Sequence, residues 1–339
     1  ARSLAEKLTA ELGQQVLVEN QPGAGSTIAS AYVANAAPDG YTLLIVANPL
    51  TVNPSLFPKL PYDLLRDFEE VRTLLEANNT PAKPTFVTWP GRSEISEFQE
   101  WGAIQTPYSP YGFRADVTPS ALEAVRHRRA GVQDEGSQLV ATIFAGASAD
   151  QSAWLDLCAG PGGKAALLAA IADQGNHRFV ANEISQIRAD LVRQVVGSHE
   201  VWVGDAREIA TRGAGFDAIL ADVPCTGVGA LRRRPEVRWR RSLADLRELG
   251  VLQREISDAA ISILNVGGVF GYATCSPHLA ETSIAVADIL KTHPELEQID
   301  VQPFMPESLN EGVRDKSMAL WTQRHNTDAM FLALFRKIS

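Results

Sequence analysis

Short apolar runs alternate with amphipathic stretches over the C-terminal two thirds of the chain. Apolar runs of four to eight residues bounded by turn residues predict buried strands, and apolar positions at 3.6-residue spacing predict helices. The alternation predicts an α/β fold with a doubly wound, mainly parallel Rossmann-like sheet, whose ligands bind at the carboxyl ends of its strands. Strands are expected at 153–157, 178–181, 200–203, 216–221 and 268–274, helices at 165–172, 184–196, 242–264 and 279–292, and an antiparallel edge strand at 329–335.

The first part of the chain has a different pattern. Helices at 3–12 and 27–36 and strands at 16–19 and 41–47 predict half of a parallel α/β unit. A turn-rich stretch with many aromatic residues follows, with a strand expected at 85–88, a helix at 120–129 and a helix ending at 145. We therefore expect three domains, at 1–71, 72–146 and 147–339.

Composition and charge narrow the class of protein. The chain has 339 residues, 45% of them hydrophobic, and a formal net charge of −9, which disfavours a surface of uniformly positive potential but allows a local basic groove. No apolar run has the length of a membrane span, and the N-terminus lacks a signal-peptide pattern. The three cysteines, Cys158, Cys225 and Cys275, lie in turn sequences and favour reduced thiols over disulfides. We expect a cytoplasmic monomer without a metal or a membrane partner.

A glycine-rich turn joins the strand at 153–157 to the following helix. The sequence from Asp156 to Lys164 places several glycines at a helix N-terminus, where backbone N–H groups are free to meet a ligand. The turn lacks both the G-x-G-x-x-G spacing and the P-loop pattern. A nucleoside-containing ligand is therefore expected, and a nicotinamide-dependent dehydrogenase is disfavoured.

Acidic residues and cysteines follow the other predicted strands. Glu183 comes after the second strand, Asp205 after the third, Asp222 and Cys225 after the fourth, and Cys275 after the fifth. Either Glu183 or Asp205 alone would more often cap a helix. Their order behind successive parallel strands instead predicts a shared crevice, with one acid at ribose hydroxyls and the other at an adenine amine.

Two thiols facing a nucleoside pocket suggest a definite reaction. A thiolate that adds to C6 of cytosine turns the ring into an enamine, and C5 of this enamine can attack a methyl donor. A carboxylic acid near N3 and the exocyclic amine would stabilise the adduct, and a base must remove the C5 proton. The residues alone leave the choice between Cys225 and Cys275 open.

Five motifs carry a resemblance to a known family. The sequences 156–164, 181–184, 204–206, 222–227 and 272–278, together with 133–138 and 324–331, resemble the Fmu/Sun family of RNA cytosine-C5 methyltransferases over about 74–337. The resemblance implies S-adenosylmethionine as cofactor, Cys275 as nucleophile, Cys225 as helper in product release, and Asp222 and Lys164 near the target base. The implied cofactor-binding residues are Cys158, Ala159, Gly160, Pro161, Gly162, Gly163, Lys164, Glu183, Arg188, Asp205 and Asp222.

An arginine-rich stretch follows the Cys225 loop. Such a stretch is usually a solvated charged face. Next to the predicted site, it is also suited to phosphate contacts and to stacking on an unpaired base. The candidate RNA-binding residues are Arg232, Arg233, Arg234, Arg238, Trp239 and Arg240. The resemblance implies ribosomal RNA as partner and a small RNA-binding subdomain at 72–146. A NusB-like domain precedes that subdomain in bacterial members, and its replacement here predicts impaired or redirected RNA loading.

Residues 1–71 resemble a second family. The motifs at 18–25, 36–43 and 58–63 are similar to those of Bug/TctC periplasmic tricarboxylate receptors, over part of their first lobe. The resemblance implies a chimera with its seam at 70–73. A carboxylate-binding receptor is the alternative function, and it is disfavoured because the second lobe of such receptors has no counterpart.

Overall fold

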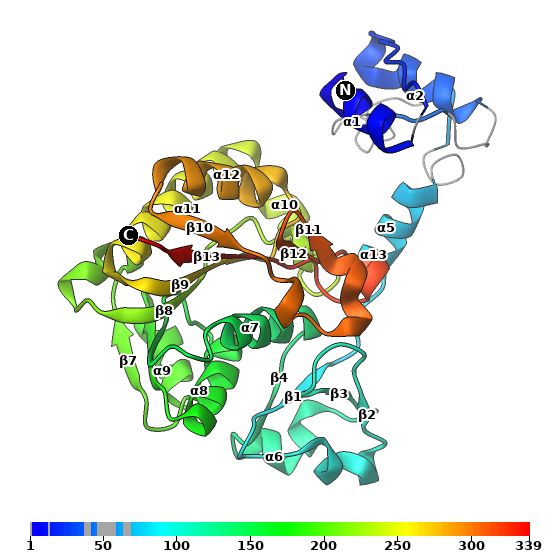
Figure 1. Ribbon diagram of the computed structural model, residues 1–339. Coiled ribbons are helices and arrows are strands. Elements are labelled where there is room, and N and C mark those ends of the chain that lie inside the picture. The colour runs from blue at the N-terminus through cyan, green and yellow to red at the C-terminus, as the bar shows by residue number, and fades with distance from the viewer. Residues whose placement is uncertain (1, 13, 37–41, 46–58, 64–68) are drawn as a thin grey trace. The chain divides into compact units, whose positions relative to one another are not determined.

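The computed structural model describes residues 2–12, 14–36, 42–45, 59–63 and 69–339 (Figure 1). The chain separates into two compact units, Ala1–Glu76 and Ala77–Ser339, whereas the sequence places this boundary at 71/72. Helix α5 (Glu69–Asn79) runs through the predicted seam at 70–73.

The first unit contains two of the expected helices. They are α1 (Arg2–Leu12) and α2 (Thr27–Ala34), the latter preceded by the 3₁₀ helix η1 (Ala24–Ser26). The strand expected at 16–19 is wrong, since these residues have no regular structure. A strand needs a neighbour to share its hydrogen bonds, and the described residues of this unit supply none. Residues 42–45 are likewise irregular, and the rest of the strand expected at 41–47 lies outside the described residues.

A small antiparallel sheet begins the second unit. Its strands are β1 (Phe86–Thr88), β2 (Ile104–Gln105), β3 (Gly112–Arg114) and β4 (Ala130–Val132), in the order β2-β3-β1-β4. Phe113 stacks on both Phe86 and Phe98 of the 3₁₀ helix η2 (Ile95–Trp101), with ring centroids 5.2 and 4.5 Å away. The helix expected at 120–129 is shorter than predicted. It consists of η3 (Pro119–Ala121) and α6 (Glu123–Arg126), and the left-handed backbone of Arg128 lies just beyond it.

The main sheet has the predicted parallel centre. Strands β5 (Ala153–Asp156), β6 (Arg178–Glu183), β7 (Glu200–Val203), β8 (Phe216–Asp222) and β9 (Leu264–Thr274) pair in parallel in the order β7-β6-β5-β8-β9. Antiparallel strands extend it beyond β9: β13 (Phe331–Lys337), β12 (Ser317–Ala319), β11 (Val313–Arg314) and β10 (Leu296–Ile299). The antiparallel strand expected at 329–335 is confirmed as β13, but its expected position at the sheet edge is wrong, because β13 pairs with β9 on one side and with β10 and β12 on the other.

Helices cover both faces of this sheet (Figure 1). Helices α7 (Glu135–Ala147), α8 (Gly163–Gly175) and α9 (Gln186–Arg193) pack on one face, and α11 (Leu243–Ile263) and α12 (Ser283–Thr292) on the other. Neighbouring residues Trp154 and Leu155 belong to the two opposite cores, as strand alternation requires. Both cores hold the strand ends in place.

Short helices occupy the remaining connections. They are η4 (Ala206–Thr211), η5 (Val228–Ala230), α10 (Val237–Arg240), η6 (Leu279–Glu281), η7 (Gln302–Phe304), η8 (Glu307–Gly312) and α13 (Thr322–His325). The helix expected at 279–292 is divided into η6 and α12 at Thr282, whose backbone is not helical. Among the described residues, no helix combines the length and the apolar character that a bilayer span requires.

Candidate active site

The glycine turn follows β5 and opens α8, as predicted. Gly160 donates its backbone N–H to Glu183 Oε2 over 3.0 Å. A Cβ atom on Gly160 would lie 2.2 Å from the same oxygen, so no side chain fits here without moving Glu183. Gly162 has a φ of +115°, a conformation that favours glycine. The turn therefore brings the main chain close to the end of β6.

Glu183 anchors the turn from the end of β6. Its side chain is 3% exposed, and its second oxygen accepts a hydrogen bond from the N–H of Ser185 over 2.9 Å. Arg188 lies 3.6 Å from Oε2 and also donates to the carbonyl oxygen of Gly160. Because each carboxylate oxygen has two lone pairs, Glu183 can still accept a hydrogen bond from a ligand hydroxyl.

Asp205 lies at the end of the neighbouring strand β7. Its carboxylate caps η4 by accepting from the N–H of Arg207 and also pairs with that arginine's guanidinium at 2.6 Å. The hydrogen bond from Arg207 lowers the pKa of Asp205. The residue is thus a helix cap, and it remains partly exposed at the same sheet edge as Glu183.

An ion pair joins the glycine turn to the end of β8. Lys164 Nζ lies 2.7 Å from Asp222 Oδ2, and both side chains are mostly buried. Burial favours neutral Lys164, but the Asp222 carboxylate outweighs it and raises the pKa of Lys164. Asp156, fully buried at the end of β5, has its pKa raised to about 7 by burial and by the nearby Asp222 charge. Lys164 therefore stays cationic beside the strand ends.

The two strand-end thiols meet. Cys225 Sγ and Cys275 Sγ are 3.3 Å apart. The hydrogen bond between the thiols lowers the pKa of Cys275, burial and the Asp222 charge oppose this, and the Lys164 cation lowers it further. The pKa of Cys225 is raised by its hydrogen bond to Cys275 and by burial. Cys275 is therefore the better placed of the pair to form a thiolate, a distinction that the sequence left open.

A buried carboxylate that sequence reasoning missed holds the Cys225 loop. Glu281 is fully buried and accepts hydrogen bonds from Thr226 N, Thr226 Oγ1 and Gln253 Nε2 at 2.8, 2.5 and 3.0 Å. Backbone hydrogen bonds of Gly229 connect this loop to its neighbours: its N–H donates to the carbonyl oxygen of Cys275, and its carbonyl oxygen accepts from the N–H of Ala329. Glu281 is a single glutamate at the end of the 3₁₀ helix η6, without a motif around it, and so it gives no sequence signal for such a role.

The arginine stretch divides into an inward and an outward part. Arg232 is only 7% exposed, and both Arg232 and Arg233 pair with Asp134 and Asp328 at 2.6 to 3.1 Å. These two arginines tie the Cys225 loop to the start of α7 and to the segment before β13, so they do not present free cations to solvent. The candidates that face solvent are Arg234, Arg238, Trp239 and Arg240, with Trp239 78% exposed.

The site fits an S-adenosyl nucleoside cofactor. The turn offers backbone groups at the N-terminus of α8, and Glu183 and Asp205 lie at the ends of adjacent strands. Gln133 is buried beside Gly163, and its Oε1 accepts no hydrogen bond from the described residues. An unpaired buried oxygen is costly, and a ligand ammonium would satisfy it. Among the described residues, no cluster of three His, Cys, Asp or Glu could hold a metal ion.

Comparisons with known proteins agree with this geometry. Residues 143–336 match the family described as 16S rRNA methyltransferase RsmB/F, and residues 1–90 match the tripartite tricarboxylate transporter family receptor, TctC. Matches to two unrelated families in successive segments agree with the interpretation of a chimeric chain.

Curated relatives match the chain over about two thirds of its length. A protein of Mycobacterium tuberculosis named "Putative methyltransferase" is 50% identical over 241 residues, covering 69% of this chain and 51% of that protein. Ribosomal RNA small subunit methyltransferase B of Vibrio cholerae is 35% identical over 252 residues, 70% of this chain and 57% of its own. The chain spans about half the length of such relatives.

Solved structures support the fold. The NSun6 protein from Pyrococcus horikoshii with SFG has a TM-score of 0.66 at 18% identity, covering 81% of this chain and 96% of its own. A methyltransferase homolog protein from the same organism also scores 0.66 at 19% identity, covering 86% and 100%. The predicted Rossmann-like methyltransferase fold is confirmed.

Proposed function

The chain belongs to the 16S rRNA methyltransferase RsmB/F family, and from this premise we propose that it transfers a methyl group from S-adenosylmethionine to C5 of a cytosine in RNA. The observation that carries the proposal is the contact between Cys225 and Cys275 beside the Lys164–Asp222 pair. Lys164 lies in the first turn of α8, directly after the glycine turn, and Asp222, Cys225 and Cys275 lie at or just after the ends of β8 and β9.

The cofactor would be held by the groups already described. Glu183 would accept from ribose hydroxyls, with Arg188 fixing its carboxylate, and Asp205 would lie at the adenine end. Gln133 Oε1 and the turn around Gly163 would meet the methionine end. When bound, S-adenosylmethionine supplies an electrophilic methyl group.

Cys275 is the nucleophile of this proposal. Its thiolate forms a bond to C6 of cytosine, which makes C5 electron-rich enough for methylation. Asp222 and Lys164 lie next to the thiols and would bind the N3 and amine edge of the base, which stabilises the adduct. Cys225 Sγ lies 3.3 Å from Cys275 Sγ, and in its thiolate form it would accept the C5 proton; loss of this proton restores the C5–C6 double bond as the sulfur–C6 bond breaks and the Cys275 thiolate leaves.

The partner in this proposal is small-subunit ribosomal RNA. Four solvent-facing residues follow the Cys225 loop and would contact phosphates or stack on an unpaired base: Arg234, Arg238, Trp239 and Arg240. The domain at 72–146 would add a second RNA contact, and the enzyme would act as a cytoplasmic monomer. The receptor-like segment does not favour a solute-binding function, since its family match ends at residue 90.

Product analysis tests the proposal. The protein is incubated with an unmodified 16S rRNA transcript and methyl-labelled S-adenosylmethionine, and the RNA is digested to nucleosides. The label is expected in 5-methylcytidine, and bisulfite sequencing of undigested RNA then gives the position. Label in another nucleoside, or unlabelled RNA from a preparation that binds the cofactor, would contradict the proposal.

A further inference from the structure

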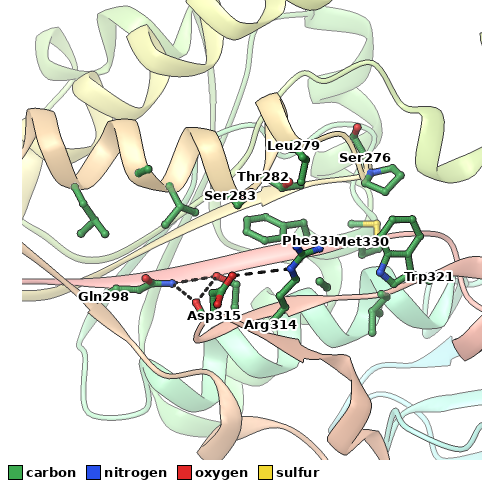
Figure 2. A pocket seen from close by; sticks show the side chains of 17 residues that line it. Ser276, Leu279, Thr282, Ser283, Gln298, Arg314, Asp315, Trp321, Met330 and Phe331 are labelled. Atoms are coloured by element: carbon green, nitrogen blue, oxygen red, sulfur yellow. Dashed lines mark hydrogen bonds and ion pairs between the residues drawn. The ribbon is translucent and has the colours of Figure 1, made fainter. Parts of the chain in front are cut away.

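A groove beside the Cys275 loop is not used by the chemistry above (Figure 2). It lies over β13, between α12 and the segment that runs from β11 through β12 to α13, and has a volume of about 250 Å³. Met330 and Phe331 form an apolar floor, while Ser283 and Ala287 on the exposed side of α12 form one wall. We call this site the α12 groove.

The α12 groove is continuous with the catalytic loop. Ser276 and Pro277 line one end of it and directly follow the nucleophile Cys275. Two residues of extended chain span about 7 Å, so this end of the groove is close to the thiol. The groove is therefore within reach of a nucleotide that neighbours a cytosine held at Cys275.

The lining suits a planar base with a phosphate. Trp321 stands at the same end as Ser276 in Figure 2 and is partly exposed, which leaves an aromatic face for stacking. The Arg314 side chain is 62% exposed at the groove, and its only carboxylate contact among the described residues is Asp315, 3.9 Å from its Nε. A distant, solvated partner leaves the guanidinium able to bind a phosphate.

A hydrogen-bond acceptor lies at the other end. Gln298 donates its amide N–H groups to the carbonyl oxygen of Asp315 and to Ser317 Oγ, at 3.1 and 3.0 Å. Both donor interactions hold the amide at this end of the groove, and its oxygen can accept a hydrogen bond from a base amine. The volume of about 250 Å³ is below the roughly 300–1,000 Å³ of pockets for drug-sized ligands, which favours a small planar group.

We propose that the α12 groove binds the unstacked base of a nucleotide neighbouring the target cytosine, with Arg314 on the adjoining phosphate. The inference rests on the proposed function, because it takes single-stranded RNA as the substrate. It adds a subsite that holds the strand in register with Cys275. Such a site would make methyl transfer depend on the sequence beside the target.

A plugging variant tests the subsite. Ala287→Trp places a large side chain in the groove from an exposed helix position, and Ile284→Trp makes a similar change at an exposed position of α12 that does not line the groove. Binding of an unmodified 16S rRNA transcript is measured by filter retention, and methyl transfer is measured separately. Ala287→Trp is expected to raise both the Kd and the KM for RNA about tenfold, the size of one lost stacking contact. Ile284→Trp should have the same Kd and KM for RNA as the parent, and both variants should keep the parent's affinity for S-adenosylmethionine.

A second variant tests the phosphate contact. Arg314→Gln should reduce the slope of log Kd against log salt concentration by about 0.7, the value for one phosphate on a single strand. Ultraviolet cross-linking of the bound transcript should recover RNA on the peptide that contains Trp321. If Ala287→Trp leaves the Kd unchanged and Arg314→Gln leaves the salt slope unchanged, the groove does not bind RNA and the proposal is refuted.

The binding measurements separate this inference from the proposed function. If the parent binds the transcript without methylating it, weaker binding by Ala287→Trp still supports the subsite while the proposed activity fails. If the parent forms 5-methylcytidine and both tryptophan variants bind RNA equally, the activity stands and the subsite is refuted.

Discussion

Replacing Gly160 by alanine tests whether the glycine turn is the cofactor site. The new Cβ would lie 2.2 Å from Glu183 Oε2 and 2.8 Å from Arg188 Nε, well inside contact distance. Glu183 cannot move freely, since its side chain is buried and its oxygens accept from the N–H groups of Gly160 and Ser185. The substitution must therefore break at least one hydrogen bond to a charged group or displace the turn.

The magnitude follows from that bond. A hydrogen bond to a charged group contributes about 1.5–3 kcal/mol, so Gly160→Ala should weaken S-adenosylmethionine binding about 10- to 150-fold. Isothermal titration calorimetry measures the Kd, and a thermal melt shows that the variant is folded. Gly250→Ala in α11 is the control, because its Cβ would meet only Arg254 Nη1, at an ordinary 3.9 Å. Parent-like affinity in a folded Gly160→Ala protein would refute the assignment of the turn to the cofactor.

Three further predictions address the thiols and the RNA contact. Lys164→Met removes a cation that lowers the pKa of Cys275, so the rise of the methylation rate with pH should move to higher pH; an unmoved profile would show that Lys164 does not act on the thiol. Glu281→Gln replaces an oxygen that accepts buried hydrogen bonds with a donor, and should lower the free energy of unfolding by about 1.5–3 kcal/mol in urea titrations; a loss below about 0.5 kcal/mol would contradict its role. Trp239→Ala should weaken binding of the 16S rRNA transcript about tenfold without changing the cofactor Kd, and equal RNA binding would exclude the stacking contact.

The parallel centre of the sheet could be predicted because its strands are short buried apolar runs with turn residues after them. That pattern also placed Glu183, Asp205, Asp222 and the two cysteines at one edge, since parallel strands end on the same side. The position of β13 could not be predicted in the same way. A run that is buried on both faces gives the same apolar pattern at any place in the sheet, and β13 lies between β9 and β12.

The candidate site could be predicted where an acidic residue or a cysteine directly follows a predicted strand. Arg232 and Arg233 show where this fails, because their carboxylate partners Asp134 and Asp328 are about a hundred residues away in the chain. Sequence proximity to other arginines indicated a charged surface, whereas tertiary pairing buries Arg232. Glu281 is a similar case, since only the folded chain brings Thr226 to it.

The central claim is that Cys275 forms the covalent bond to RNA and Cys225 helps to break it. The direct measurement is a denaturing gel of each cysteine variant after incubation with S-adenosylmethionine and an unmodified 16S rRNA transcript. Cys225→Ala should accumulate a protein–RNA adduct that survives denaturation, while Cys275→Ala and the double variant should give neither adduct nor 5-methylcytidine. Undiminished methyl transfer by Cys275→Ala, or an adduct that persists in the double variant, would contradict the account.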